Sequence, residues 1–65
     1  MSIAERIYNA KQEIKAIDYL IDELYKKYQD ETISWMYLSD RKKAYELEKA
    51  ELRSMIFRLN QFGTL

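Results

Sequence analysis

Apolar residues recur along the first part of the chain at alternating steps of four and three residues. The segment IAERIYNAKQEIKAIDYLIDELYKKY, residues 3–28, carries them at Ile3, Ile7, Ala10, Ile14, Ile17, Ile21, Leu24 and Tyr28. Their mean spacing of about 3.5 residues is the period of a seam in a coiled coil or helical bundle, and strand-like alternation does not occur. The pattern therefore predicts a helix over about residues 3–29.

The sequence also contains signals for the start and the end of this helix. Ser2 is followed three residues later by Glu5, which fits a capping box at a helix start. The apolar pattern breaks in QDETIS, residues 29–34, where Asp30, Thr32 and Ser34 are all suitable N-caps for a second helix. Two helices joined by so short a connection, about residues 30–33, are expected to run antiparallel.

A second helix is expected over about residues 33–61. Its seam contains Leu38, Tyr45, Leu52 and Leu59 at steps of seven, and Gly63 is suited to the C′ position that follows a helix. Ser39 followed by Asp40 offers a later start, which would make ISWMYL an ordered connection. The earlier start is preferred because it gives two helices of matching length.

The second helix is less regular than the first. In the frame of Leu38, the companion seam positions are Arg41, Glu48, Met55 and Phe62, so half of them are charged. A weaker apolar strip lies to one side and comprises Ile33, Met36, Tyr37, Ala44 and Leu47. Two partial stripes on one helix indicate contacts on two flanks.

The expected fold is all-α: one antiparallel helical-hairpin domain spanning residues 1–65. Ordering a residue costs about 1.5 kcal/mol while apolar burial returns about 25 cal/mol per Å², so a hairpin with one interface is marginal. It would also expose Leu20, Tyr25, Trp35, Met36 and Leu47. We therefore expect a homodimer that forms a four-helix bundle, or a larger partner protein that covers the exposed apolar surface. The packing and dimer seam is predicted at Ile7, Ile14, Ile17, Ile21, Leu24, Tyr45, Leu52, Met55 and Leu59.

Composition narrows the possible chemistry. The 65 residues include no Cys and no His, which removes disulfides, thiolate metal sites and the commonest general base. Eleven basic residues balance eleven acidic ones, and no apolar run is long enough to cross a membrane. No catalytic residue, metal or cofactor is expected. The sequence predicts a cytoplasmic protein that is not an enzyme and has no membrane partner.

Residues 11–28, KQEIKAIDYLIDELYKKY, resemble the first helix of the all-helical chorismate mutases. The resemblance rests on spaced Ile and Leu residues around an "ID" pair and covers less than a third of the chain. The family has a substrate-binding arginine about where Tyr28 stands, so the resemblance does not extend to its activity.

The segment SWMYL, residues 34–38, combines the only Trp with Met, Tyr and Leu at the expected turn. Trp and Tyr are frequent among binding hot spots, and Met adapts to irregular surfaces. Packing at the end of the bundle is the alternative interpretation. We predict a partner-binding surface at Trp35, Met36, Tyr37 and Leu47, used by a small adaptor, chaperone or inhibitor of the kind found among phage and mobile-element products.

A second hypothesis concerns nucleic acid. Lys42, Lys49 and Arg53 share one predicted helix face and could hold a phosphate backbone. In length and architecture the chain is similar to Rop-like dimeric helical hairpins, which bind RNA. The neutral net charge and Glu46 among these cations favour a solvated face instead.

Overall fold

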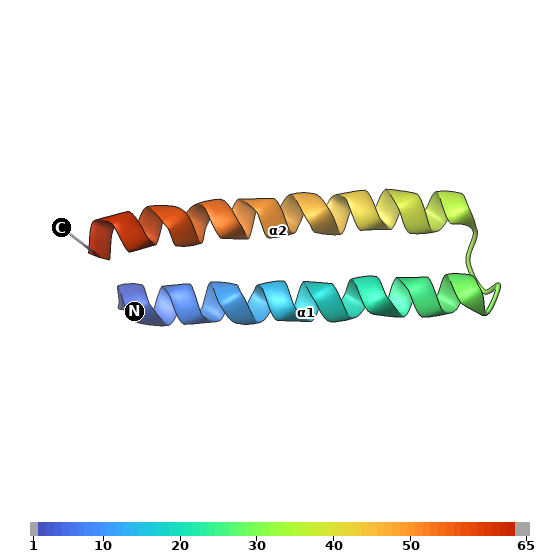
Figure 1. Cartoon of the computed structure of the whole chain (residues 1–65), viewed down its shortest axis with the longest axis horizontal. Helices are drawn as coiled ribbons and strands as arrows, with labels where there is room; N and C mark the ends of the chain where they lie inside the picture. The colour runs from blue at the N-terminus through green and yellow to red at the C-terminus, as the bar shows by residue number, and fades with distance from the viewer. Residues whose placement is uncertain (1, 64–65) are drawn as a thin grey trace.

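The computed structural model shows two long antiparallel helices side by side (Figure 1). Helix α1 spans Ile3–Gln29 and helix α2 spans Trp35–Gly63. The structure describes residues 2–63, and the hairpin measures 50 × 15 × 14 Å. The predicted all-α helical hairpin is confirmed.

Helix α1 begins where the sequence predicts. Ser2 is its N-cap, and the Ser2 Oγ accepts a hydrogen bond from the Glu5 backbone N–H at 3.1 Å. Glu5 lies in the first turn of the helix, and Lys26 and Lys27 lie in its last turn. These charges oppose the helix dipole at both ends and stabilise the helix.

The connection between the helices is tied to the last turn of α1. The Asp30 N–H donates to the Lys26 carbonyl at 3.0 Å, and the Thr32 N–H donates to the Lys27 carbonyl at 2.9 Å. Glu31 has a φ of 63°, which is the left-handed region that a non-glycine residue rarely adopts. This residue turns the chain out of the helical path so that it can reverse.

Helix α2 begins two residues later than predicted, after Ser34. The Ser34 Oγ accepts from the Tyr37 N–H at 3.2 Å, and its carbonyl accepts from the Leu38 N–H at 3.1 Å. Ser34 is therefore the N-cap, and the alternative start after Ser39 is wrong. The helix continues to Gly63, two residues past the predicted end at about residue 61, so Gly63 is helical and does not follow the helix as a C′ residue.

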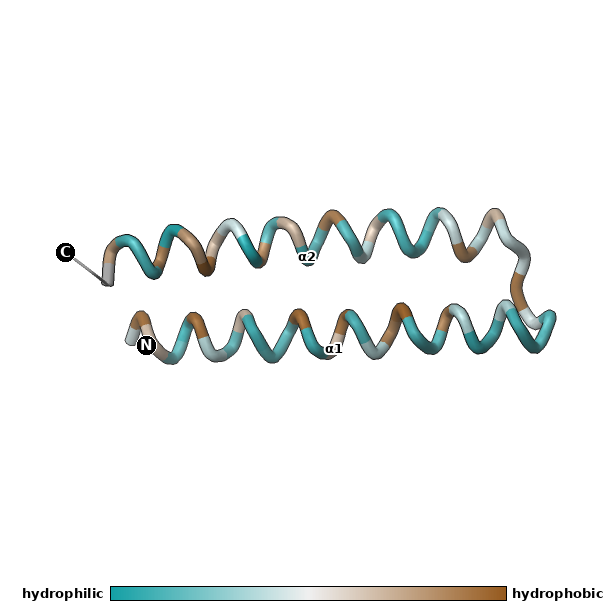
Figure 2. Tube along the Cα trace, viewed as in Figure 1, coloured by the Kyte–Doolittle hydropathy of each residue, from teal (hydrophilic) through white to brown (hydrophobic). Residues whose placement is uncertain are grey.

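The core is the seam between the helices. Figure 2 shows the apolar positions of α1 turned toward α2 along most of its length. Ile3 and Tyr28, at the ends of the α1 stripe, are 39% and 40% exposed. Buried apolar residues are Ala10, Ile17, Ile21, Leu24, Leu38 and Leu59, and Ile7, Ile14, Tyr45, Leu52 and Met55 are half-buried.

The α2 side of the seam differs from the prediction. The expected companions Arg41 and Glu48 are exposed, and Phe62 is 66% exposed. The residues that alternate with Leu38, Tyr45, Leu52 and Leu59 on the covered side are instead Lys42, Lys49 and Ile56, one position further along the chain. A hydropathy pattern misses them because lysine buries its aliphatic stem while its charge finds a polar partner.

Neither helix, within the part of the chain that the structure describes, is long and apolar enough to cross a membrane.

Candidate interaction surface

The turn end of the hairpin carries an exposed aromatic pair. The rings of Tyr28, in the last turn of α1, and Trp35, at the start of α2, lie 5.6 Å apart at 62°. Such an edge-to-face contact contributes about 0.5–1.5 kcal/mol beyond area burial. Trp35 nevertheless remains 59% exposed. The contact holds the indole in place while leaving most of it available to another molecule.

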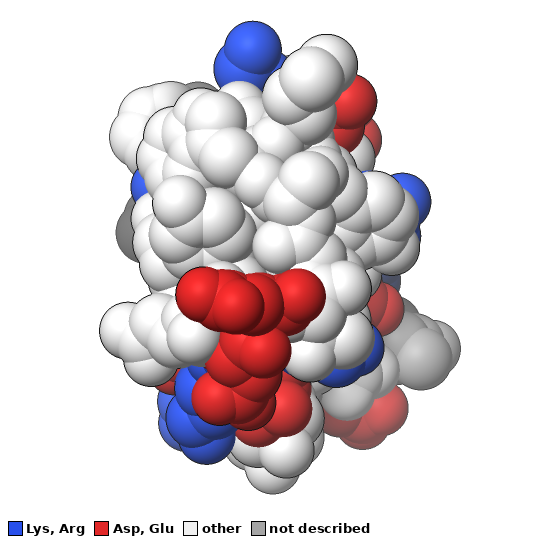
Figure 3. Space-filling view, turned by 90° about the vertical axis from the view of Figure 1, so that its right-hand side faces the viewer, with Lys and Arg blue, Asp and Glu red and all other residues white. Residues whose placement is uncertain are grey.

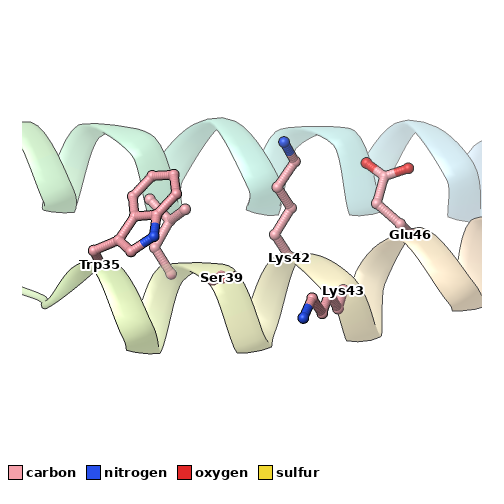
Figure 4. Close-up of a pocket in the computed structure, with 6 residues that line it drawn as sticks. Trp35, Ser39, Lys42, Lys43 and Glu46 are labelled. Carbon is pink, nitrogen blue, oxygen red and sulfur yellow. The ribbon is translucent and has the colours of Figure 1, made fainter.

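A recess of about 370 Å³ lies beside the indole (Figure 4). Leu38, only 1% exposed, supplies its apolar base. Figure 4 shows Trp35 and Lys42 reaching toward α1, whereas Lys43 points away from it. The lining residues, which we call the Trp35 recess, are Trp35, Leu38, Ser39, Lys42, Lys43 and Glu46.

Lys42 is held at the edge of this recess by α1. Its Nζ donates a hydrogen bond to the Tyr25 hydroxyl at 2.6 Å and lies 5.2 Å from the centre of the Tyr25 ring. The hydrogen bond from Lys42 to Tyr25 raises the pKa of the Lys42 ammonium, and the Coulombic interaction with Tyr25 acts in the same direction. Lys42 therefore stays charged next to the indole.

The four predicted partner-binding residues do not form one patch. Successive helix residues point about 100° apart, so Trp35 and Tyr37 face nearly opposite flanks of α2. Met36 and Leu47 are eleven residues apart and share the outward face of the helix, where they are 76% and 63% exposed. Tyr37 is 51% exposed. The structure thus joins Trp35 to Tyr28, which the sequence placed in the seam, and separates it from Leu47.

The upper part of the turn end is poor in charge. Figure 3 looks directly at it and shows a mainly uncharged surface with acidic side chains grouped in the lower part of the view. The connection itself contributes Asp30 and Glu31. An uncharged area with a charged border is the composition expected of a protein-binding surface.

The predicted basic face is not assembled, and this prediction needs correction. Lys49 is only 8% exposed, and its Nζ lies 2.5 Å from Oδ1 of Asp18 and 3.9 Å from Oε1 of Glu46. Lys42 is bound by Tyr25. Arg53 is exposed and lines an open recess with Ser54, Phe57 and Arg58. Two of the three cations therefore serve contacts between the helices and do not form a surface for phosphate.

A further interaction that the sequence did not indicate involves Arg41. One of its guanidinium nitrogens, Nη2, donates to the Tyr45 hydroxyl at 3.3 Å, and its Cζ lies 5.2 Å from the centre of that ring. The hydrogen bond with Tyr45 raises the pKa of the guanidinium. Tyr45 thereby fixes the direction of a charged side chain on the flank of α2.

Among residues 2–63, no group of three or more acidic side chains is arranged to hold a metal ion. Comparison of the chain with protein-family models, curated proteins and solved structures gave no match.

Proposed function

We propose that this chain is a cytoplasmic, non-enzymatic interaction protein that binds a larger protein stoichiometrically through its turn end. The observation that carries the proposal is Trp35, which is fixed against Tyr28 yet 59% exposed beside a recess with an apolar base. A rigid aromatic side chain loses little entropy on binding. For this reason Trp and Tyr dominate interface hot spots.

The chemistry of the partner follows from the surroundings of the indole. The partner would offer an apolar pocket for Trp35 and a carboxylate within reach of Lys43, whose side chain points away from α1. Met36, 76% exposed on the adjacent face, would add adaptable apolar contact. Lys42, already bound to Tyr25, would help to orient the indole and would not anchor the partner itself.

The test is affinity capture with the whole chain from an extract of the organism that encodes it. We expect the Trp35→Ala, Met36→Ala double variant to lose a protein that the wild type retains, while its helical circular dichroism stays unchanged. The captured protein is then purified, and its binding to both chains is measured. Two truncated hot-spot side chains should weaken it by about 4 kcal/mol, or roughly a thousandfold.

The matched control is Tyr8→Ala with Tyr19→Ala. These tyrosines are 62% and 63% exposed on the outward side of α1, away from the turn end. Equal capture by the wild type and both double variants would contradict the proposal, as would failure of the wild type to retain any protein. Loss of helicity in the Trp35, Met36 variant would assign these residues to the core.

A further inference from the structure

The two flanks of the hairpin differ in whether their charged side chains have a polar partner on the other helix. On one flank, Lys49 binds Asp18 and Lys42 binds Tyr25, so polar groups of α1 and α2 meet across the seam. The other flank carries two rows at steps of seven residues. We call these rows the open flank: Arg6, Glu13, Leu20 and Lys27 on α1, and Arg41, Glu48, Met55 and Phe62 on α2.

A groove of about 650 Å³ near the chain termini shows that both rows lie on the same side of the hairpin. Arg6 from the α1 row lines it together with Met55 and Phe62 from the α2 row. Ile3, Arg58 and Leu59 complete the lining. Near the chain termini, the two rows of the open flank thus border one groove.

One pair of like charges stands level across this flank. The contacts of Asp18 with Lys49 and of Tyr25 with Lys42 fix the register, so that residues whose numbers sum to about 67 face each other. At this register Lys27 is near the level of Arg41. The cross-helix ion pair among the described residues is Lys49 with Asp18, which lies on the opposite flank. The open flank therefore does not neutralise itself.

We propose that a second copy of this chain packs on the open flank, antiparallel, about a twofold axis at the level of Leu20. Glu13 and Lys27 each lie seven residues from Leu20, so the axis brings Glu13 of one copy opposite Lys27 of the other. Leu20, which is 43% exposed, meets its own equivalent. The α1 layer then has an apolar centre with an unlike charge pair on each side.

The same axis also pairs unlike charges in the α2 layer. Glu46 lies within one residue of the level of Leu20 at the register of the hairpin, and Arg41 and Glu51 each lie five residues from Glu46. Arg41 of one copy therefore stands opposite Glu51 of the other. Its direction is already fixed by Tyr45. Glu48 lies two residues from Glu46 and comes near its own equivalent at the axis, so the α2 layer combines one like-charge contact with two Arg41–Glu51 pairs.

Exposed apolar groups are covered by this arrangement as well. Tyr37 and Met55 each lie nine residues from Glu46, so Tyr37 of the second copy reaches Met55 at the edge of the terminal groove. Tyr37 is 51% exposed in the single hairpin. The result is a four-helix bundle with apolar contacts between its layers and charged pairs at the border.

A copy stacked with both turns at the same end is disfavoured by charge. In that arrangement α1 of each copy lies over α2 of the other, at the same register as within one hairpin. Lys27 of one copy would then lie over Arg41 of the other. Like charges across an interface select against a partner orientation, and here they select the antiparallel dimer.

This dimer does not depend on the function proposed above. The Trp35 recess includes Lys42, whose contact with Tyr25 lies on the flank away from the second copy. The recess therefore stays open in the dimer, and each dimer would present two of them. Failure of the dimer would leave the partner-binding proposal intact, and the reverse also holds.

Cysteine cross-linking tests the axis directly, because the chain has no cysteine of its own. Two cysteines at the axis approach within disulfide distance. Under mild oxidation, Leu20→Cys should convert mostly to a covalent dimer, while Tyr19→Cys, on the outward side of α1, should remain largely reduced. Equal cross-linking of the two variants, or none in Leu20→Cys, would overturn the proposed axis.

Charge exchange provides a second test, read by sedimentation equilibrium. Glu13→Lys places like charges together at two symmetric positions and should raise the dimer dissociation constant at least about tenfold. Adding Lys27→Glu to the same chain should return it to within about threefold of the wild type. A monomeric wild type, or a double variant as weak as Glu13→Lys, would refute the arrangement.

Discussion

The Nζ of Lys49 lies 2.5 Å from Oδ1 of Asp18, although Lys49 occupies a covered seam position between the two helices. A cation in this place is tolerated because its carboxylate partner is half-exposed, which keeps the pair partly solvated. The pair also favours one register of α2 against α1, since sliding by a turn would separate the two charges.

Removal of the carboxylate should destabilise the hairpin. Asp18→Ala leaves the Lys49 ammonium in the seam with Glu46 3.9 Å away as its remaining acidic neighbour. We expect a loss of about 1–2 kcal/mol in the free energy of unfolding, less than for a fully buried pair because Asp18 is half-exposed. Urea denaturation measures this loss. An unchanged midpoint would show that the ion pair contributes nothing to stability.

Replacement of the lysine should have a different effect. Lys49→Met keeps an unbranched side chain of similar length in the seam and removes the need to desolvate a charge. Apolar replacements of buried ion pairs are often neutral or stabilising. We expect Lys49→Met to unfold within about 1 kcal/mol of the wild type, or at a higher denaturant concentration. A loss comparable to that of Asp18→Ala would mean that the ion pair itself drives the packing.

Leu38 and Leu47 form a matched pair for testing where the core lies. Leu38 is 1% exposed and Leu47 is 63% exposed on the same helix. Leu38→Ala should lower the free energy of unfolding by about 2–4 kcal/mol, which for so small a domain removes much of the folded population. Leu47→Ala should stay within about 0.5 kcal/mol. Thermal unfolding followed by circular dichroism distinguishes these results, and similar losses would contradict the described seam.

Ser34 offers a test of the start of α2. Its Oγ accepts a backbone hydrogen bond from Tyr37, so Ser34→Ala should cost about 1 kcal/mol. The control is Ser54→Ala at an exposed position inside the same helix, where alanine has the higher helix propensity and no loss is expected. Equal stability of the two variants would argue for another cap.

The pKa of Lys42 should depend on its contact with Tyr25. Its pKa is raised in the folded chain, so the contact stabilises the fold fully below the unfolded pKa of lysine. This contribution is lost as the pH rises through the higher folded value, a window above about pH 10. NMR titration of the Lys42 side chain should show a lower pKa in Tyr25→Phe than in the wild type. Tyr19→Phe should leave it unchanged, and a fall in both variants would contradict a specific contact.

The first helix could be predicted from the sequence in detail, whereas the second could not. Between Ile7 and Leu24 the seam of α1 consists of apolar residues, so the hydropathy period and the packing coincide. In α2, Lys42 and Lys49 occupy seam positions because Tyr25 and Asp18 supply polar partners from the other helix. No property of the α2 sequence alone reveals these partners.

The candidate surface was predicted in part. One seam between two helices cannot cover all the apolar residues of this sequence, so Trp35 and Met36 were expected to be exposed. Their exposure is confirmed. The contact between Trp35 and Tyr28 was not predicted. Tyr28 continues the apolar stripe of α1, and the path of the turn determines which aromatic ring of α2 it contacts. The direction of each α2 side chain depended on the helix start at Trp35, which several possible caps left open.

The most direct test of the proposed function uses the fact that Trp35 is the only tryptophan. A chain labelled with 5-fluorotryptophan gives a single ¹⁹F resonance from this position and is titrated with the purified protein that the wild type captures. We expect the resonance to shift or broaden and to saturate at one bound partner molecule per recess. A complex that forms while the resonance stays unchanged would contradict this expectation, because Trp35 would then lie outside the interface.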